Sequence, residues 1–222
     1  MKSSVTKVAA AAVIVLGVLL STRLWDSSVH SAYAVEQTFA AMRTIKSMHV
    51  YSTDWDGSKG ETWIQINPET GYEEYYRAEE GNFLIVGTPK ATYYYDKDKN
   101  RVRIRNKYMP ASEVRFSRFF EDIVEWVRQH NGTLTFHDEF DEDLGREVIV
   151  VWFAVPAQEE MCEKEGAIRV DSQTKLPISY EAFKGRPEEG TQSVNRIEYN
   201  VTLAEGLFEF EIPDGAEVVY SD

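Results

Sequence analysis

Three arginines that alternate along the chain are the first residues whose spacing could serve binding. Arg101, Arg103 and Arg105 are separated by single apolar residues, and alternate residues of a β-strand point to the same face. Guanidinium groups on one face could hold an anionic headgroup or an acidic protein partner. However, the chain has 37 acidic and 24 basic residues, a net charge of −13. We therefore predict a solvated arginine face that is balanced by carboxylates on adjacent strands, such as Glu73 and Glu74.

Metal binding is not indicated beside these arginines. Asp96, Asp98 and Asn100 stand at the alternate positions of a calcium-binding loop. Such a loop also needs a Gly at its sixth position and a Glu at its twelfth. This chain has Arg101 and Lys107 there, so the segment is predicted to be a charged hairpin turn.

Groups that could catalyse a reaction are dispersed along the chain. None of the four histidines has a metal-binding i, i+4 spacing, and no Ser or Cys lies in the signature of an activated nucleophile. The only cysteine, Cys162, can form no intramolecular disulfide. We predict no catalytic residues, no metal and no cofactor, and we expect a protein that is not an enzyme. The negative net charge also argues against nucleic acid as a partner.

The N-terminus has the pattern of an export segment. Lys2 and Lys7 precede an uncharged apolar run over residues 8–20, which is the usual order when the N-terminus stays in the cytoplasm. With the residues up to Trp25, the run is long enough for a membrane anchor with basic residues at its ends.

The anchor divides the chain into three regions. We predict a cytoplasmic tail over residues 1–7, a transmembrane signal anchor over residues 8–25 and an extracytoplasmic domain over residues 26–222. In a bacterium, this places a single-pass protein in the inner membrane with its C-terminal domain in the periplasm. The alternative is a signal that is cleaved after "AYA", residues 32–34. Cleavage there would remove the first turn of a helix predicted from Ser31, so the anchor is favoured.

The extracytoplasmic region is predicted to be an α+β domain. A helical apolar spacing begins at Val35 and continues to Ile45. About six short alternating segments between residues 48 and 106 follow, and their spacing predicts an antiparallel meander. More strands are predicted after residue 133, the last of them "LFEFEIP" at residues 207–213.

Two segments of this domain carry unusual apolar surface. A second helix is predicted over residues 112–130, with Phe116, Phe119, Phe120 and Ile123 on one face. Every residue of the strand "VIVVWFAV", residues 148–155, is apolar. Both faces of this strand therefore need cover, which favours helices on one side and a partly covered surface or a ligand cavity on the other.

The order of these elements resembles that of the LolA/LolB/RseB superfamily, the periplasmic lipoprotein-carrier-like fold. In that family a strand commonly runs into an Asp-x-x-Thr-x-Leu-Pro turn, and the chain often closes on Phe-x-Phe-x-x-Pro-x-Gly. The matching residues here are Asp171, Thr174, Leu176, Pro177, Phe208, Phe210, Pro213 and Gly215. The resemblance implies a curved antiparallel half-barrel sheet covered by helices, with an apolar interior that takes acyl chains.

These observations lead to one expected function and one alternative. We expect a membrane-anchored periplasmic domain that binds a lipid, or the acyl chain of a lipoprotein, in a half-barrel cavity. The predicted lining residues are Phe116, Phe119, Phe120, Ile123, Val150 and Trp152. The alternative is an envelope-stress sensor or regulatory interaction protein that acts through another membrane protein.

Overall fold

The computed structural model describes residues 34–54, 56–106, 118–142, 144–157, 164–184 and 191–221. The chain divides into two compact units, Met1–Gln37 and Thr38–Asp222, and all the strands belong to the second unit. The predicted tail at residues 1–7 and the predicted anchor at residues 8–25 lie outside the described residues. Within the described ranges, no helix is both long and apolar enough to cross a membrane.

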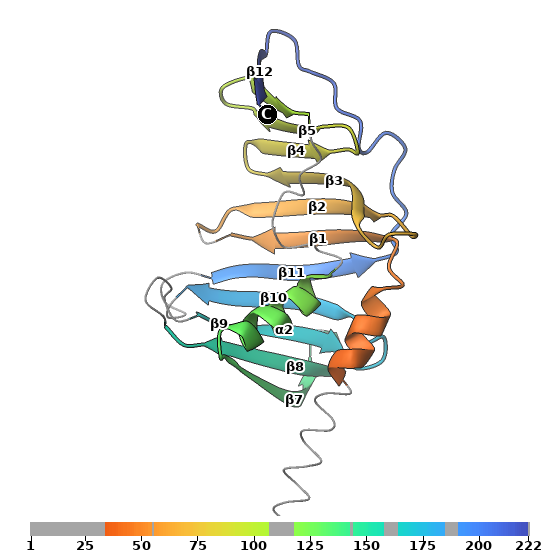
Figure 1. Cartoon of the computed structure of the whole chain (residues 1–222), viewed down its shortest axis with the longest axis vertical. Helices are drawn as coiled ribbons and strands as arrows, with labels where there is room; N and C mark the ends of the chain where they lie inside the picture. Colours follow the sequence, from red (N-terminus) through yellow and green to blue (C-terminus); the bar gives the residue numbers. More distant parts are fainter. Residues whose placement is uncertain are drawn as a thin grey trace, which may run out of the picture. The chain divides into compact units, whose positions relative to one another are not determined.

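One open sheet organises the second unit (Figure 1). Its described strands are β1 (Ser47–Thr53), β2 (Lys59–Ile66), β3 (Glu73–Glu80), β4 (Phe83–Gly87), β5 (Thr92–Asp96), β6 (Arg101–Arg105), β7 (Thr133–Asp141), β8 (Arg146–Val155), β9 (Lys164–Asp171), β10 (Pro177–Lys184), β11 (Thr191–Tyr199) and β12 (Glu217–Ser221). Their spatial order is β12-β6-β5-β4-β3-β2-β1-β11-β10-β9-β8-β7. All neighbours run antiparallel except β12 and β6, which run parallel.

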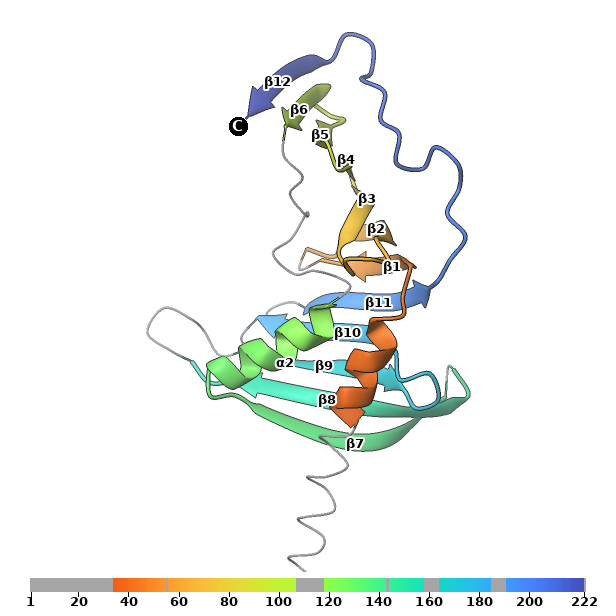
Figure 2. The same ribbon diagram turned by 45° about the vertical axis from the view of Figure 1, so that its right-hand side comes forward.

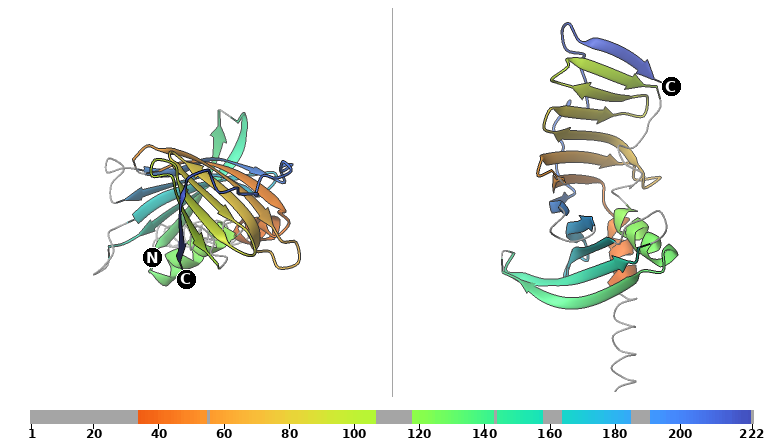
Figure 3. Two further views of the ribbon diagram at one scale, coloured as in Figure 1. Left: turned by 90° about the horizontal axis from the view of Figure 1, so that it is seen from above. Right: turned by 90° about the vertical axis from the view of Figure 1, so that its left-hand side faces the viewer.

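The first six strands form the predicted antiparallel meander. Each of the strands β1 to β5 pairs with the next one along the chain. The connecting turns use residues in the left-handed region, such as Gly57 at φ +83° and Asn100 at φ +43°. Figure 3 shows that successive strands are rotated relative to one another, which is the twist that open sheets normally adopt.

The later strands extend the sheet on the other side of β1. Strands β7 to β11 are sequential neighbours, and β11 pairs with β1. At this junction Met48 lies opposite Tyr199, and Val50 lies opposite Ile197. The pairing joins the meander to the second group of strands in one continuous sheet.

The prediction of a strand over residues 207–213 is wrong. These residues belong to an irregular segment that runs beside the meander (Figure 2). Phe208 lies 5.6 Å from Tyr75 and Phe210 lies 5.0 Å from Tyr93, measured between ring centroids. The alternating aromatic residues therefore reflect packing onto tyrosines of the sheet, and the strand that the sequence did not reveal is β12.

Two helices are described. The first covers residues 34–42, and α2 covers Phe119–Gln129. The predicted start of the second helix, at residue 112, lies outside the described residues. Its end is where the sequence places it, because Asn131 takes a left-handed φ of +55°. Figure 2 shows α2 over one face of the strands β8 to β10, and we call this face of the sheet the inner face.

The main core lies between the helices and the inner face. Because α2 places Phe119, Phe120, Val124 and Val127 on one side, these four residues are buried. The cluster to which Phe119 belongs also contains Met42, Ile45, Met48, Ile64, Ile66, Tyr76 and Ile197. We call this group the core cluster.

The turn between β9 and β10 is built around one buried carboxylate. An oxygen of Asp171 accepts hydrogen bonds from the backbone N–H groups of Gln173 and Thr174 at 2.9 and 2.6 Å, and from the Thr174 hydroxyl at 3.0 Å. Its other oxygen lies 2.6 Å from the Arg146 guanidinium on β8. Lys175 follows at φ +60°. The Asp-x-x-Thr-x-Leu-Pro motif is therefore a turn whose acidic residue also ties two strands together.

The same contacts determine how Asp171 titrates. Burial is the strongest influence and opposes ionisation, but the hydrogen bonds from Thr174 and Gln173, with the charge of Arg146, outweigh it. The net result is a pKa below the ordinary value of 3.8. A lowered folded-state pKa stabilises the fold above the ordinary value, and this stability is lost as the pH falls through the folded-state pKa.

We predict that Asp171→Asn lowers the free energy of unfolding by about 1–3 kcal/mol at neutral pH, because it leaves buried donors without their charged acceptor. The difference from the unsubstituted protein should shrink as the pH falls below about 4, because protonation of this aspartate in the unfolded chain then removes the stability that its lowered folded-state pKa contributes. Urea denaturation between pH 3 and pH 7 measures both effects. The control is Glu147→Gln, which removes an exposed carboxylate from β8. An equal loss of stability in the two variants would contradict the prediction.

Candidate functional site

The aromatic residues predicted on the second helix belong to the core. Phe119 and Phe120 are only 5% and 1% exposed, and Ile123 packs against the core cluster. Phe120 meets Phe39 of the first helix edge-on, with 5.7 Å between ring centroids. Phe116 lies outside the described residues. The described side chains of this helix face therefore fill the space between α2 and the sheet.

The two lining residues predicted on β8 point the other way. Phe153 lies on the inner face, where it stacks on Tyr180 with ring centroids 6.1 Å apart. Because side chains alternate along a strand, Val150 and Trp152 point to the opposite, outer face. They form a separate cluster there with residues of β8, β9 and β10. The predicted residues thus fall into two groups on two sides of the sheet, and their role in ligand binding stays a prediction.

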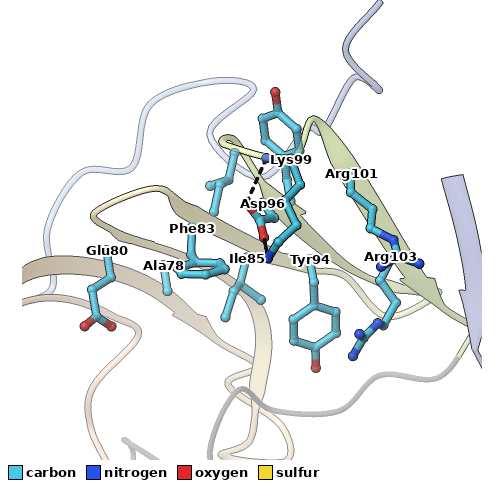
Figure 4. Close-up of a pocket in the computed structure, with 11 residues that line it drawn as sticks. Ala78, Glu80, Phe83, Ile85, Tyr94, Asp96, Lys99, Arg101 and Arg103 are labelled. Atoms are coloured by element: carbon cyan, nitrogen blue, oxygen red, sulfur yellow. Dashed lines mark hydrogen bonds and ion pairs between the residues drawn. The ribbon is translucent and has the colours of Figure 1, made fainter. Parts of the chain in front are cut away.

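A pocket is present elsewhere on the inner face, over strands β3 to β6 (Figure 4). Its volume is about 480 Å³, which lies in the range of small-molecule sites. The residues that line it include Ala78, Phe83, Ile85, Tyr94, Arg101 and Arg103. We call it the meander pocket.

Strand register explains how these residues meet. Ala78 pairs with Ile85, Ile85 with Tyr94, and Tyr94 with Arg103, so one row of side chains crosses four strands. Ala78 lies two residues after Tyr76 of the core cluster and therefore shares the inner face with it. Ile85 also packs against the core cluster. The floor of the pocket is thus a continuation of the apolar core into the meander.

A second row forms the margin of the pocket. Glu80 pairs with Phe83, Phe83 with Asp96, and Asp96 with Arg101. Phe83 is 56% exposed, which is unusual for a large apolar side chain beside a pocket. In Figure 4, Phe83 and Ile85 lie between Glu80 on one side and the two arginines on the other. The pocket therefore has an apolar floor, with Glu80 at one end, the two arginines at the other end and the ion pair of Asp96 with Lys99 between them.

The cations of the pocket differ in how they are balanced. Lys99 lies 2.7 Å from Asp96, and this hydrogen bond lowers the pKa of the Asp96 carboxyl. Arg101 lies 3.3 Å from Glu217 on β12. Arg103 is exposed, and no described carboxylate forms an ion pair with it. The pocket thus presents one guanidinium whose charge is not neutralised in the described part of the chain.

The predicted partners of the arginines are therefore wrong in part. Glu73 and Glu74 lie on β3, which β4 and β5 separate from β6. A carboxylate that does balance an arginine, Glu217, comes from the parallel strand β12. Since parallel pairing joins segments far apart in the sequence, the meander pattern alone could not reveal this neighbour.

A second hollow of about 440 Å³ lies between the C-terminal end of the first helix, the start of α2 and the turn after β2. Glu121 occupies it with two ion pairs, at 3.1 Å to Arg43 and 2.6 Å to Arg118. The contact with Arg43 links α2 to the end of the first helix, whereas the contact with Arg118 lies within the start of α2. The hollow is therefore less suited to an apolar ligand than the meander pocket.

The sequence contained the signals for the meander pocket, but not its geometry. Alternation placed Arg101 and Arg103 on one face, and the same alternation links Phe83 with Ile85. Alternation alone could not predict the register of the strands, which aligns these side chains in one row.

Comparisons with known proteins show a likeness in fold. No protein-family profile matches the chain, and no curated protein matches it. An uncharacterized conserved protein from Thermus thermophilus has a similar solved structure, with a TM-score of 0.50 and 12% identity over 86% of this chain and 99% of that chain.

The Pseudomonas aeruginosa MucA/MucB complex gives a second match, with a TM-score of 0.51 and 12% identity. It covers 82% of this chain and 61% of the matched chain. Identities this low establish the fold alone. The two structural matches confirm the resemblance to the lipoprotein-carrier-like fold, which in this chain is an open and mostly antiparallel sheet with few helices.

We predict that Phe119→Ala lowers the free energy of unfolding by about 3–5 kcal/mol, because it leaves a void in the core cluster. The matched control is Phe83→Ala in the meander pocket, which should change stability by less than about 1 kcal/mol since Phe83 is already exposed. Thermal and urea denaturation of both variants measure the difference. A small loss for Phe119→Ala would mean that this side chain borders a cavity instead of a packed core.

Proposed function

We propose that this protein is a non-enzymatic binding module that holds the acyl chain of a lipid or lipoprotein in the meander pocket. The observation that carries the proposal is the apolar row of Ala78, Ile85 and Tyr94, which extends from the core cluster onto an open part of the sheet. An exposed apolar surface next to a pocket is typical of a ligand-binding site. An acyl chain would cover this row and the exposed ring of Phe83.

The composition of the pocket supports binding over catalysis. Its described lining residues include no Ser, Cys or His, so they supply neither the usual nucleophile nor the usual general base of a hydrolase. The lining offers apolar side chains and a few charges, which can hold and orient a ligand.

The proposal includes the place where the protein works. Residues 8–25 would anchor the chain in the inner membrane of a bacterium, with the described sheet in the periplasm. A binding module tethered in this way meets lipids at the membrane surface. Its fixed position suits it to holding or presenting a ligand more than to carrying one across the periplasm.

Photo-crosslinking in the full chain tests the proposal. A benzophenone amino acid at position 83, irradiated in native membranes, should form adducts with lipid that mass spectrometry can identify. Ala78→Phe should lower the adduct yield at least about fivefold, because it fills the floor of the pocket. The control Ala204→Phe adds the same ring at an exposed position away from the pocket and should leave the yield unchanged.

A second crosslinker position separates pocket binding from random contact with the membrane. Tyr220 on β12 is 69% exposed and does not line the meander pocket. Lipid adducts should be several times more abundant from position 83 than from position 220. Equal yields from the two positions, or no lipid adduct from position 83, would contradict the proposed function.

A second candidate function is an envelope-stress sensor or regulatory protein that acts through another membrane protein. The observation that favours it is the structural match to the Pseudomonas aeruginosa MucA/MucB assembly, which is a complex of two proteins. The end strand β7 also offers a binding edge in the described sheet, because it pairs on one side only. On this strand, Phe140 is 60% exposed.

Crosslinking from the edge of β7 tests this second candidate. A benzophenone at position 140 should capture one membrane protein in native membranes, and the same group at position 220 should not capture it. Asp138→Pro, placed on the end strand, should abolish the adduct if the partner pairs with the strand edge. A lack of any protein adduct at position 140 would contradict this function.

A further inference from the structure

We propose that the meander pocket selects an amphiphile whose polar head is negatively charged, with Arg103 as the residue that contacts the head. This inference rests on the proposed function, because it concerns the ligand of the same pocket. It adds the charge of the headgroup and the direction in which the ligand lies.

The side chains along one row of the pocket change from apolar to cationic. Ala78, Ile85, Tyr94 and Arg103 follow one another across four strands on the inner face. Three apolar or aromatic groups therefore lead directly to a guanidinium. Neighbouring strands lie about 4.8 Å apart, so the row spans about 14 Å, comparable with an extended acyl segment. This order matches an amphiphile, which has an apolar tail and a polar head.

The positive charges at the end of the row are only partly balanced by carboxylates. Lys99 and Arg101 each have a carboxylate partner, at 2.7 and 3.3 Å. Arg103 has Tyr94 on one side and Val219 on the other as its cross-strand neighbours, and neither can neutralise it. A guanidinium binds phosphate and carboxylate groups through paired N–H donors. A headgroup anion would therefore supply the partner that the described residues do not.

The opposite end of the pocket carries a negative charge. Glu80 lies at the opposite end of the pocket from the two arginines (Figure 4), where its carboxylate accepts a hydrogen bond from the Ser58 hydroxyl at 2.7 Å. A negative charge at that end repels an anionic head. The head is therefore directed to Arg103, and the tail lies over Ile85 toward Ala78.

The positive charge of Arg103 stands out because the protein as a whole is negatively charged. A net charge of −13 repels anionic ligands at a distance. Retention of an anionic amphiphile then depends on contacts within the pocket, where screening by salt is incomplete. Removal of the contact with Arg103 should therefore change the selectivity between headgroups, and it should affect the binding of the tail less.

The experiment uses the full chain in nanodiscs that contain equal amounts of phosphatidylglycerol and phosphatidylcholine with identical acyl chains. With the benzophenone at position 83, the adducts should contain about fivefold more phosphatidylglycerol than phosphatidylcholine, which corresponds to about one exposed ion pair. Arg103→Gln should bring this ratio close to one and leave the phosphatidylcholine adducts unchanged. A rise in NaCl concentration should also lower the ratio in the unsubstituted chain.

The matched control is Arg196→Gln, which removes one positive charge from a side chain that is 67% exposed and pairs with Glu198. It should keep the unsubstituted ratio, since Arg196 does not line the meander pocket. A ratio of one in the unsubstituted chain with adducts still formed would overturn the headgroup inference and leave the proposed function standing. The absence of adducts with both lipids would overturn the proposed function itself. An equal fall in the ratio for both variants would show a general charge effect and also overturn the role of Arg103.

Discussion

The pairing of β1 with β11 is the contact on which the rest of the structure depends. It joins segments about 150 residues apart and aligns Met48 with Tyr199 and Val50 with Ile197. The first helix and α2 then pack on a face to which both groups of strands contribute. Asn200, at φ +54°, secures the end of the pair, because its side-chain oxygen accepts a hydrogen bond from the Lys46 amide at 2.9 Å. Without this pairing, the meander would have no apolar surface continuous with the core, and the row from Ala78 to Arg103 would not extend it.

The centre of this shared face is neutral as well as apolar. Burial raises the pKa of Tyr180 to about 12 and also raises the pKa of Tyr199, whose hydroxyl donates to the Pro177 carbonyl at 2.5 Å. Tyrosine is already protonated at physiological pH in water, and burial moves the ionisation of both phenols further above that pH. Toward the meander, the inner face reaches charged groups, and Arg103 on β6 is one of them. This division between a neutral middle and charged margins suits an amphiphile, whose tail needs a surface without charge and whose head needs a counter-charge.

Local patterns in the sequence predicted most of the strands, but they did not reveal β12 or the contacts between distant segments. Alternation predicted the six meander strands, and the Asp171 turn was located from its motif, because both depend on residues close in the chain. The segment at residues 207–213 alternates too, but its aromatic residues pack on Tyr75 and Tyr93 from the meander. Period alone cannot distinguish such packing from strand pairing. The same limit applied to β8, where an unbroken apolar run left open which residues face α2. The structure places Phe153 there and turns Val150 away.

The described part of α2 is short compared with the sheet on which it packs. With 11 residues, α2 is about 16 Å long at a rise of about 1.5 Å per residue. Twelve strands in one sheet extend over about 50 Å at a spacing of about 4.8 Å. Even laid straight across the strands, α2 could cover only about a third of the inner face, and it lies over β8 to β10. Irregular backbone with Phe208 and Phe210 packs on tyrosines of the other face of the meander. Apolar side chains such as Phe83 therefore stay exposed on the inner face of the meander, beyond the reach of α2. An acyl chain would bury this surface there without any change in the sheet.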